Sequence, residues 1–119
     1  MIIDTVRRIY ESTYCDSCSI TENVKQKVDG VTSFHDEIVI SNQPCKLSFE
    51  SIPSTNESNT VASVVQSTKL FIAPEIKVKP GSKIDVTHLG VTASYKRSGK
   101  PAVYHTHQEI MLELWKEHA

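Results

Sequence analysis

The sequence predicts an all-β protein: a small antiparallel β-barrel with a short N-terminal helical segment and a long polar loop. Through much of residues 75–115, apolar and polar side chains alternate with a period of two, which is typical of strands with one buried face. Dipeptides that favour tight turns, such as Asp29-Gly30 and Pro80-Gly81, separate the alternating runs. The 119 residues are 39% hydrophobic and 23% charged, the composition of one soluble globular domain spanning residues 1–119.

Charge and cysteine usage exclude several classes of protein. A formal charge of −1 does not favour stable binding to DNA or to an acidic membrane. No apolar run is long enough to cross a membrane and no charged leader precedes one, so we expect neither a membrane span nor a secretion signal. Three cysteines are an odd number, which argues against a complete set of disulfides and indicates a reducing compartment.

Residues 1–12 are expected to form an amphipathic segment that packs on the barrel or caps its end. Apolar residues recur there at helical spacing, for example at Ile2, Val6 and Ile9, while Arg7 and Glu11 lie on the opposite side. Because so short a helix is marginal in water, it must gain its order from docking.

Residues 13–49 are predicted to form a long hairpin with Asp29-Gly30 at its turn. One face of the first strand would carry Tyr14, Cys18, Ile20, Val24 and Val28. The returning strand includes residues 37–40 and is expected to break at residues 42–44. It then continues with Cys45, Leu47 and Phe49 on one face.

Residues 51–60 are the most polar uninterrupted part of the chain and predict a flexible loop. Two interpretations stay open: a disordered surface connection, or a loop that becomes ordered when a partner arrives. In the second case Thr55, Asn56, Glu57 and Ser58 would make contacts between subunits or gate the assembly. A strand that leads back to the barrel is expected over residues 61–70.

Residues 75–104 predict successive hairpin strands. Lys79-Pro80-Gly81-Ser82 has the chemistry of a type II turn, Leu89-Gly90 indicates a bulge or sharp bend, and Ser98-Gly99 marks the next reversal. The residues expected to face inward are Ile76, Val78, Ile84, Val86, Val91, Ala93 and Tyr95.

Residues 108–115 fit two structures. As a strand, the segment places Ile110, Leu112 and Leu114 inside. As a helix, it has a different apolar face, which does not include Leu112. Helix propensity favours the second structure. We favour the strand, because strict alternation accounts for every aliphatic residue.

No constellation of residues predicts catalysis, so we expect a protein that is not an enzyme and that binds no cofactor. Cys15 and Cys18 have a zinc-ligand spacing, and His105 and His107 would share one face of a strand. A single Cys-x2-Cys is a weak signal, however, and small buried thiols with surface histidines are the simpler interpretation. Cys45 lies in a strand pattern without an orienting group, which disfavours a Cys–His nucleophile.

Lysines gather on the hairpins of the second half. Lys77, Lys79 and Lys83 decorate one predicted hairpin, residues 96–100 are also basic, and the tail from residue 109 is acidic. Separated charges of both signs suit self-association, although lysines on edge strands also prevent unwanted pairing. We expect Lys77, Lys79 and Lys83 to serve in docking.

Several segments give the chain a resemblance to a known family. In order they are Asp29-Gly30, Pro44-Cys45-Lys46-Leu47-Ser48, Lys69-Leu70-Phe71-Ile72, residues 80–87, residues 95–101 and His107-Gln108-Glu109-Ile110. From about residue 14 onward this pattern resembles the XkdH/YqbH-like proteins of defective prophages and phage-like elements of bacilli. More broadly, the chain is similar to the small head-closure, or stopper, proteins beneath the portal of tailed phages.

The resemblance implies a β-barrel that repeats as a ring around the DNA channel, between portal or adaptor and tail-completion proteins, and helps to retain packaged DNA without reading its sequence. It places the protein in the bacterial cytoplasm during assembly and then at the virion head-tail interface. It also implies that an inserted loop, here Ser51 to Gln66, reorganises on assembly. Two alternatives stay open: a barrel that binds single-stranded nucleic acid through Tyr95 and Tyr104 beside Lys96 and Arg97, and a zinc-stabilised interaction module.

Overall fold

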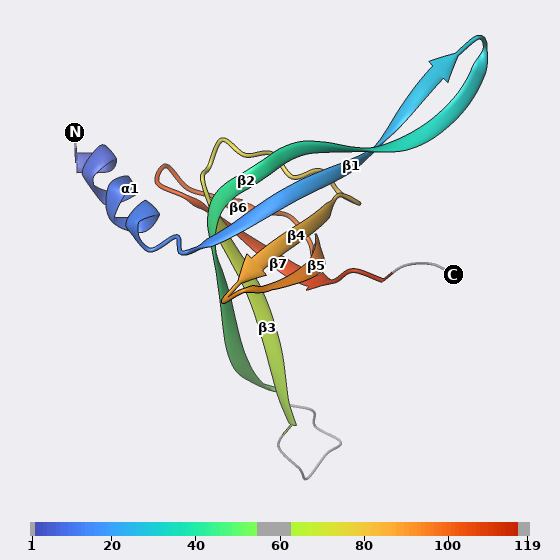
Figure 1. Cartoon of the computed structure of the whole chain (residues 1–119). Coiled ribbons are helices and arrows are strands. Elements are labelled where there is room, and N and C mark those ends of the chain that lie inside the picture. Colours follow the sequence, from blue (N-terminus) through green and yellow to red (C-terminus); the bar gives the residue numbers. More distant parts are fainter. Residues whose placement is uncertain (1, 55–62, 117–119) are drawn as a thin grey trace.

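A computed structural model describes residues 2–54 and 63–116, and over these residues the protein is mostly strand with one short helix (Figure 1). The elements are α1 (Ile2–Ser12), β1 (Asp16–Val28), β2 (Val31–Ser54), β3 (Ser63–Ile72), β4 (Lys83–His88), β5 (Val91–Arg97), β6 (Ala102–Val103) and β7 (Gln108–Leu114). The strands form one sheet in the order β3-β2-β1-β4-β5-β7-β6, and β7 also pairs with β3. Every pairing is antiparallel, so the prediction of a mostly β, antiparallel protein with one short helix is confirmed.

The first hairpin turns at the predicted dipeptide. Asp29 and Gly30 both have positive φ, 51° and 78°, as a two-residue type I′ turn requires. The predicted break at residues 42–44 is wrong, because β2 continues through Pro44, which pairs with Ser17. Register shifts opposite residues 18–21 and a φ of 52° at Asn42 show β-bulges there, which absorb extra residues without ending the strand.

The second hairpin is longer than the polar composition suggested. β2 pairs with β3 from Cys45 opposite Ile72 as far as Ser54 opposite Ser63. The first four residues of the expected 51–60 loop are therefore strand, because each finds a partner on β3. Thr55, Asn56, Glu57 and Ser58 lie outside the described residues.

A strand was expected over residues 75–79, before the turn at residues 79–82, and that expectation is wrong. Ile76 and Val78 do pack against the core, but the backbone groups around them bind side chains instead of a neighbouring strand. The amide Nε2 of Gln108 donates to the carbonyl oxygens of Ala73 (2.8 Å) and Ile76, and Arg97 Nη1 donates to that of Val78 (2.8 Å). These bonds satisfy backbone acceptors that a strand ladder would otherwise use.

Two turns flank β4. The N–H of Ser82 donates to the carbonyl of Lys79 (3.2 Å) and Gly81 has a φ of 84°, so the expected type II turn is confirmed. Leu89-Gly90 is a tight hairpin turn between β4 and β5 rather than a bulge within a strand. Both residues have positive φ, 51° and 79°, which the short connection demands.

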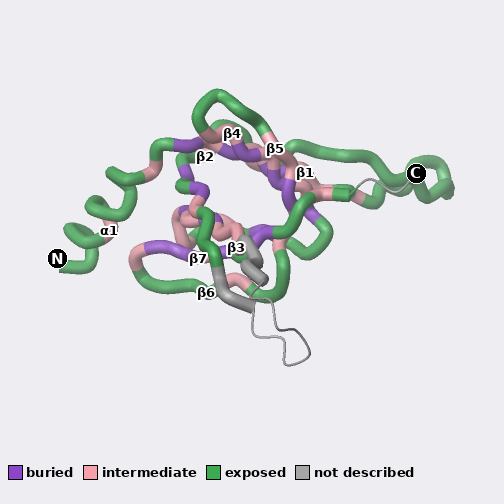
Figure 2. The backbone as a smooth tube through the Cα atoms, turned by 90° about the horizontal axis from the view of Figure 1, so that it is seen from below, coloured by how far each residue is buried: buried purple, intermediate pink, exposed green. Residues whose placement is uncertain are grey.

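The core lies in the middle of the sheet, where the buried segments gather in Figure 2. Its buried residues are Cys18, Ile20, Cys45, Leu47, Leu70, Ile72, Val78, Ile84, Val86, Tyr95, Ile110 and Leu112. The strand predicted over residues 108–115 is confirmed as β7. Val91 and Leu114 are exposed although they were expected inside, because each lies at the end of its strand, beyond the core.

Candidate interaction surfaces

An aromatic stack attaches α1 to the sheet. The ring of His107, just before β7, stacks with Tyr10 of α1 and with Tyr104, at centroid distances of 4.2 and 4.9 Å. Phe71 of β3 lies 5.9 Å from the same ring. His107 is buried, so one side chain joins the helix, the β6–β7 connection and β3.

Hydrogen bonds and charge hold His107 in this position. Its Nδ1 lies 2.9 Å from Thr106 Oγ1 and its Nε2 lies 2.9 Å from Glu109 Oε2. The other oxygen of Glu109 lies 3.0 Å from Lys69 Nζ. The hydrogen bond with His107 and the Lys69 ammonium together lower the pKa of Glu109, and Glu109 in turn raises the pKa of Lys69.

The apolar side of α1 stays uncovered. Arg7 forms ion pairs with Glu11 (2.7 Å) and with Glu75, and the hydrogen bond from Arg7 lowers the pKa of Glu75. No residue of the helix is buried, and Ile2 and Ile9 are 84% and 62% exposed. The helix is therefore fixed by polar and aromatic contacts while its aliphatic residues face outward.

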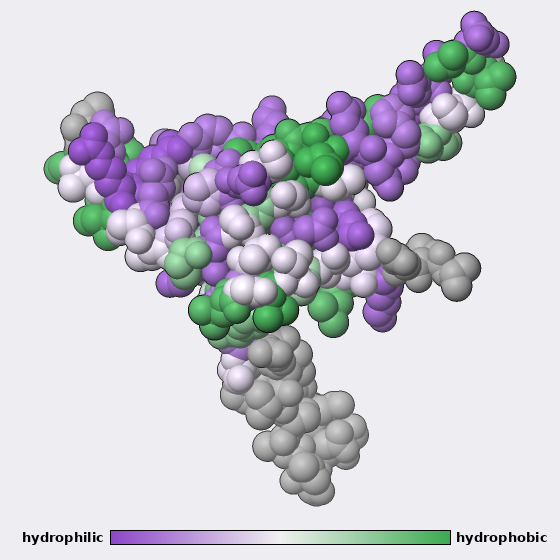
Figure 3. All heavy atoms as spheres, viewed as in Figure 1, coloured by the Kyte–Doolittle hydropathy of each residue, from purple (hydrophilic) through white to green (hydrophobic). Residues whose placement is uncertain are grey.

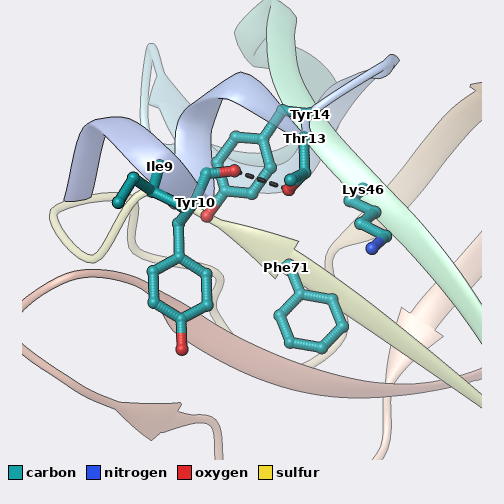
Figure 4. Close-up of a pocket in the computed structure, with 6 residues that line it drawn as sticks. All are labelled: Ile9, Tyr10, Thr13, Tyr14, Lys46 and Phe71. Atoms are coloured by element: carbon teal, nitrogen blue, oxygen red, sulfur yellow. Dashed lines mark hydrogen bonds between the residues drawn. The ribbon is translucent and has the colours of Figure 1, made fainter. Parts of the chain in front are cut away.

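A small apolar pocket, the helix pocket, opens where α1 meets the sheet (Figure 4). Its volume is about 260 Å³, and its lining residues are Ile9, Tyr10, Thr13, Tyr14, Lys46 and Phe71. Lys46 of β2 contributes the only charge to this lining. The hydroxyl of Tyr14 is buried and has no hydrogen-bond partner within residues 2–54 and 63–116, and burial raises the pKa of Tyr14 to about 12.

The β1–β2 hairpin projects from the rest of the sheet as an arm, which we define as residues 22–37 (Figure 1). Thr21 is the last residue of β1 that pairs with β4, and within the described chain the arm strands pair only with each other. At about 3.3 Å per residue the arm is roughly 23 Å long. Hydrophobic side chains show near its end in Figure 3, and Val28, Val31 and Phe34 are all at least half exposed. Val28 was expected on a buried face and is exposed because the arm has left the core.

A basic groove lies beside β6. It has a volume of about 700 Å³ and is lined by Pro74, Ile76, Lys77, Val78, Lys79, Pro80, Arg97, Lys100, Pro101, Val103 and Gln108. The structure thus brings Lys77 and Lys79 together, and Lys79 Nζ also lies 3.4 Å from Glu22. Lys83 does not line the groove; its Nζ lies 5.8 Å from the ring centroid of Trp115. The sequence placed Arg97 and Lys100 in a separate basic cluster, and only the fold shows that they share this groove.

The cysteines and histidines of the proposed zinc set are not brought together on one strand face. Cys15 is exposed and Cys18 is buried, while His105 and His107 lie in the connection between β6 and β7. In the part of the chain that the structure describes, no three His, Cys, Asp or Glu side chains form a group that could hold a metal ion. A hydrogen bond with Cys18, together with burial, raises the pKa of the Cys45 thiol, which keeps that sulfur a poor nucleophile.

Asp16, at the start of β1, is a buried carboxylate that was not predicted. Its Oδ2 accepts a hydrogen bond from the Leu47 backbone N–H, and its Oδ1 lies 2.8 Å from His88 Nδ1. The residue therefore ties β1 to β2 and to the end of β4. The signal was present in the period-two row of Cys18 and Ile20, which places Asp16 on the same inward face when extended by two residues.

The alternative function in single-stranded nucleic acid binding required two tyrosines on an exposed sheet face. Tyr95 is only 7% exposed and belongs to the core, so it offers no surface on which a base could stack. Tyr104 is exposed but stacks with His107. The stacking platform that this alternative needs is therefore not formed.

The arrangement of strands has a counterpart among solved structures. The chain is similar to the phage-like element PBSX protein xkdH from Bacillus subtilis, with 16% sequence identity and a TM-score of 0.52. The two share a fold. The match covers 83% of this chain and 93% of xkdH. No family model matches the chain, and neither does any curated protein sequence. Among the described residues, no helix has the length and apolar character needed to cross a membrane.

Proposed function

We propose that the chain is a non-enzymatic structural protein of a phage-like particle, a head-closure or head-tail connector subunit that assembles as a ring between portal and tail and helps to retain packaged DNA. The observation that carries this proposal is the fold shared with xkdH over 83% of the chain. The sequence pattern from about residue 14 onward and the fold shared with xkdH both support a protein of a phage-like element.

The strand pairings support a closed barrel as the central part of each subunit. β7 pairs with both β5 and β3, so the pairings that run from β3 through β2, β1, β4, β5 and β7 return to β3. Closure removes sheet edges and gives a rigid centre, from which the arm and the β2–β3 hairpin project. A contact between different surfaces of neighbouring copies, repeated around an axis, closes into a ring.

The basic groove is suited to a neighbouring connector protein of the particle. Lys77 and Lys79 contribute positive charge to a groove with an apolar floor, and β6 pairs only with β7 among the described strands. An extended acidic segment of the neighbour fits this place, because it can pair with a free strand edge while its carboxylates meet the lysines. Lys83 and the segment Thr55–Ser58 remain proposed contacts, the first for docking and the second between subunits.

The net charge of −1 suits a ring around DNA that must move, because such a subunit does not clamp a polyanion. The test is production of the phage-like particles in a host strain that lacks this protein. We expect heads that lose their DNA and tails that remain unattached, with both defects corrected by the wild-type chain. Tailed, DNA-filled particles formed without the protein would refute the proposal.

Two variants locate the docking surfaces in the same assay. Lys77→Glu should reduce head-tail joining, whereas Lys116→Glu makes the same charge change at an exposed lysine outside the groove and should not. Deletion of residues 55–59 should abolish joining while the thermal unfolding transition stays nearly unchanged. Loss of that transition would instead show that the deleted segment is needed for the core.

A further inference from the structure

The arm presents an apolar face that its own molecule does not cover. Side chains alternate along a strand, so Phe34, Asp36 and Ile38 of β2 share one face, the last of them at the base of the arm. Phe34 and Ile38 are each 65% exposed. Between them the Asp36 carboxylate is held by Asn23, whose Nδ2 donates to it at 3.0 Å.

The helix pocket has the size and chemistry to receive one such side chain. At about 260 Å³ it lies below the roughly 300–1,000 Å³ typical of small-molecule sites. It exceeds the roughly 150 Å³ of an apolar cavity that accommodates benzene, so a phenyl ring fits. The exposed residues Ile2, Val6 and Ile9 follow one another at helical spacing and lead to it.

The charge in the lining is complementary to that of the arm. Lys46 is the only charged residue there, and Asp36 is the carboxylate that lies between the two apolar side chains of the arm face.

The arm and the helix lie at opposite ends of the molecule, as both Figure 1 and Figure 2 show. An arm therefore meets a helix pocket only on another copy. Because the two surfaces differ, the contact joins copies head to tail and leaves one arm and one pocket free at the two ends, until a ring closes.

We propose that the arm of one copy inserts Phe34 into the helix pocket of the next copy, with Asp36 against Lys46 and Ile38 against the exposed side of α1. The inference rests on the proposed function in one respect: it identifies the subunit contact of the ring. It can be tested on the purified chain, without any particle.

The first experiment measures self-association by sedimentation. The variants Phe34→Ser and Ile9→Asp should each weaken the association by at least roughly 10-fold, the effect of removing a large apolar side chain from an interface. Leu89→Ser is the matched control, because Leu89 is 85% exposed on the turn between β4 and β5 and should leave the association unchanged. All three positions are well exposed, so the thermal transition should hold.

The second experiment tests whether the contact is head to tail. The Phe34→Ser chain keeps its pocket and the Ile9→Asp chain keeps its arm, so an equimolar mixture should form one-to-one dimers and nothing larger. Asp36→Lys and Lys46→Asp should each weaken the association of the single variants, and the two changes in one chain should restore it. Native mass spectrometry reads both results.

Several results would overturn the inference: a wild-type chain that remains monomeric at about 1 mM, association that survives both Phe34→Ser and Ile9→Asp, or a charge exchange that fails to restore it. None of these results would change the expected outcome of the particle assay. Conversely, a chain that associates through this contact but is dispensable for head-tail joining would remove the proposed function and leave the contact standing.

Discussion

Substitution of Asp16 by alanine should destabilise the protein strongly, although the residue begins a strand and carries a charge. Its side chain is 2% exposed, and it accepts the Leu47 backbone N–H at 2.8 Å. Alanine leaves that N–H buried without an acceptor, which costs about 1–3 kcal/mol. The change also removes the carboxylate partner of His88, whose ring nitrogen Nδ1 lies 2.8 Å from Asp16 Oδ1 in the wild type.

Because His88 is partly exposed, the loss of unfolding free energy expected for Asp16→Ala is smaller than for breaking a fully buried pair. Removing one partner of a fully buried pair costs about 3–5 kcal/mol, and the His88 side chain is 29% exposed. Water can therefore solvate the histidine that remains. We expect Asp16→Ala to lower the free energy of unfolding by about 3 kcal/mol, with the orphaned Leu47 N–H supplying the larger part.

Urea denaturation followed by circular dichroism measures this loss, and two further variants divide it. Asp16→Asn keeps an oxygen acceptor for the Leu47 N–H and should cost about half as much as alanine. His88→Ala, which leaves the Leu47 bond intact, should cost about 1 kcal/mol. If Asp16→Ala cost less than about 1 kcal/mol, or no more than His88→Ala, the link from Asp16 to Leu47 would not stabilise the fold and the reasoning would fail.

Three other changes test separate features of the protein. Tyr14→Phe removes a buried hydroxyl without a partner in the described chain and should raise the free energy of unfolding by about 1 kcal/mol; a loss in urea denaturation would contradict this. The folded pKa of Glu109 is lowered, so its contribution is present above the unfolded pKa of about 4.3 and is lost as the pH falls through the folded pKa. In urea midpoints measured against pH, Glu109→Gln should therefore be less stable near neutrality and should lose less stability on acidification than the wild type; parallel profiles would count against the pair with His107. Gly90→Ala should cost about 1 kcal/mol from its φ of 79°, since no heavy atom beyond the adjacent residues lies within 4 Å of the added methyl; an unchanged thermal transition would contradict this.

Local chemistry predicted those parts of the fold that short segments determine. The Asp29-Gly30 turn, the type II turn at residues 79–82 and the strand identity of residues 108–114 follow from glycine conformation and period-two alternation. The inward rows around Ile84 and Ile110 are correct for the same reason. Alternation, however, does not tell where a strand leaves the core, which is why Val28 and Leu114 were placed inside.

Long-range pairing explains the remaining errors. Ser51 to Ser54 look like a loop by composition, but β3 supplies a partner for each backbone group. Ile76 and Val78 alternate like a strand, yet Gln108 and Arg97 bind their carbonyl groups first. No local pattern contains this information, because the partners lie outside each segment, 9 to 32 residues away in the chain.

The candidate surfaces were predictable only in part. The lysines at positions 77 and 79 do share a groove, but its remaining cations come from the end of β5 (Arg97) and from the connection after it (Lys100). The helix pocket was not predicted, since it arises where a helix at one end of the chain meets Lys46 and Phe71 from the middle. The aliphatic spacing of α1 suggested that one side of the helix would be buried, but its aliphatic residues are exposed.

The arm has a further consequence for how the free chain behaves in heavy water. Its amide groups belong to a two-stranded ribbon with which no other described strand pairs, and such ribbons open at low energetic cost. Deuterium should therefore enter residues 24–37 much sooner than Ser17, Cys18 and Ile20, which pair with both β2 and β4. If the proposed contact forms, deuterium uptake at these arm residues should slow, and the slowing would show residue by residue when the arm has bound another copy.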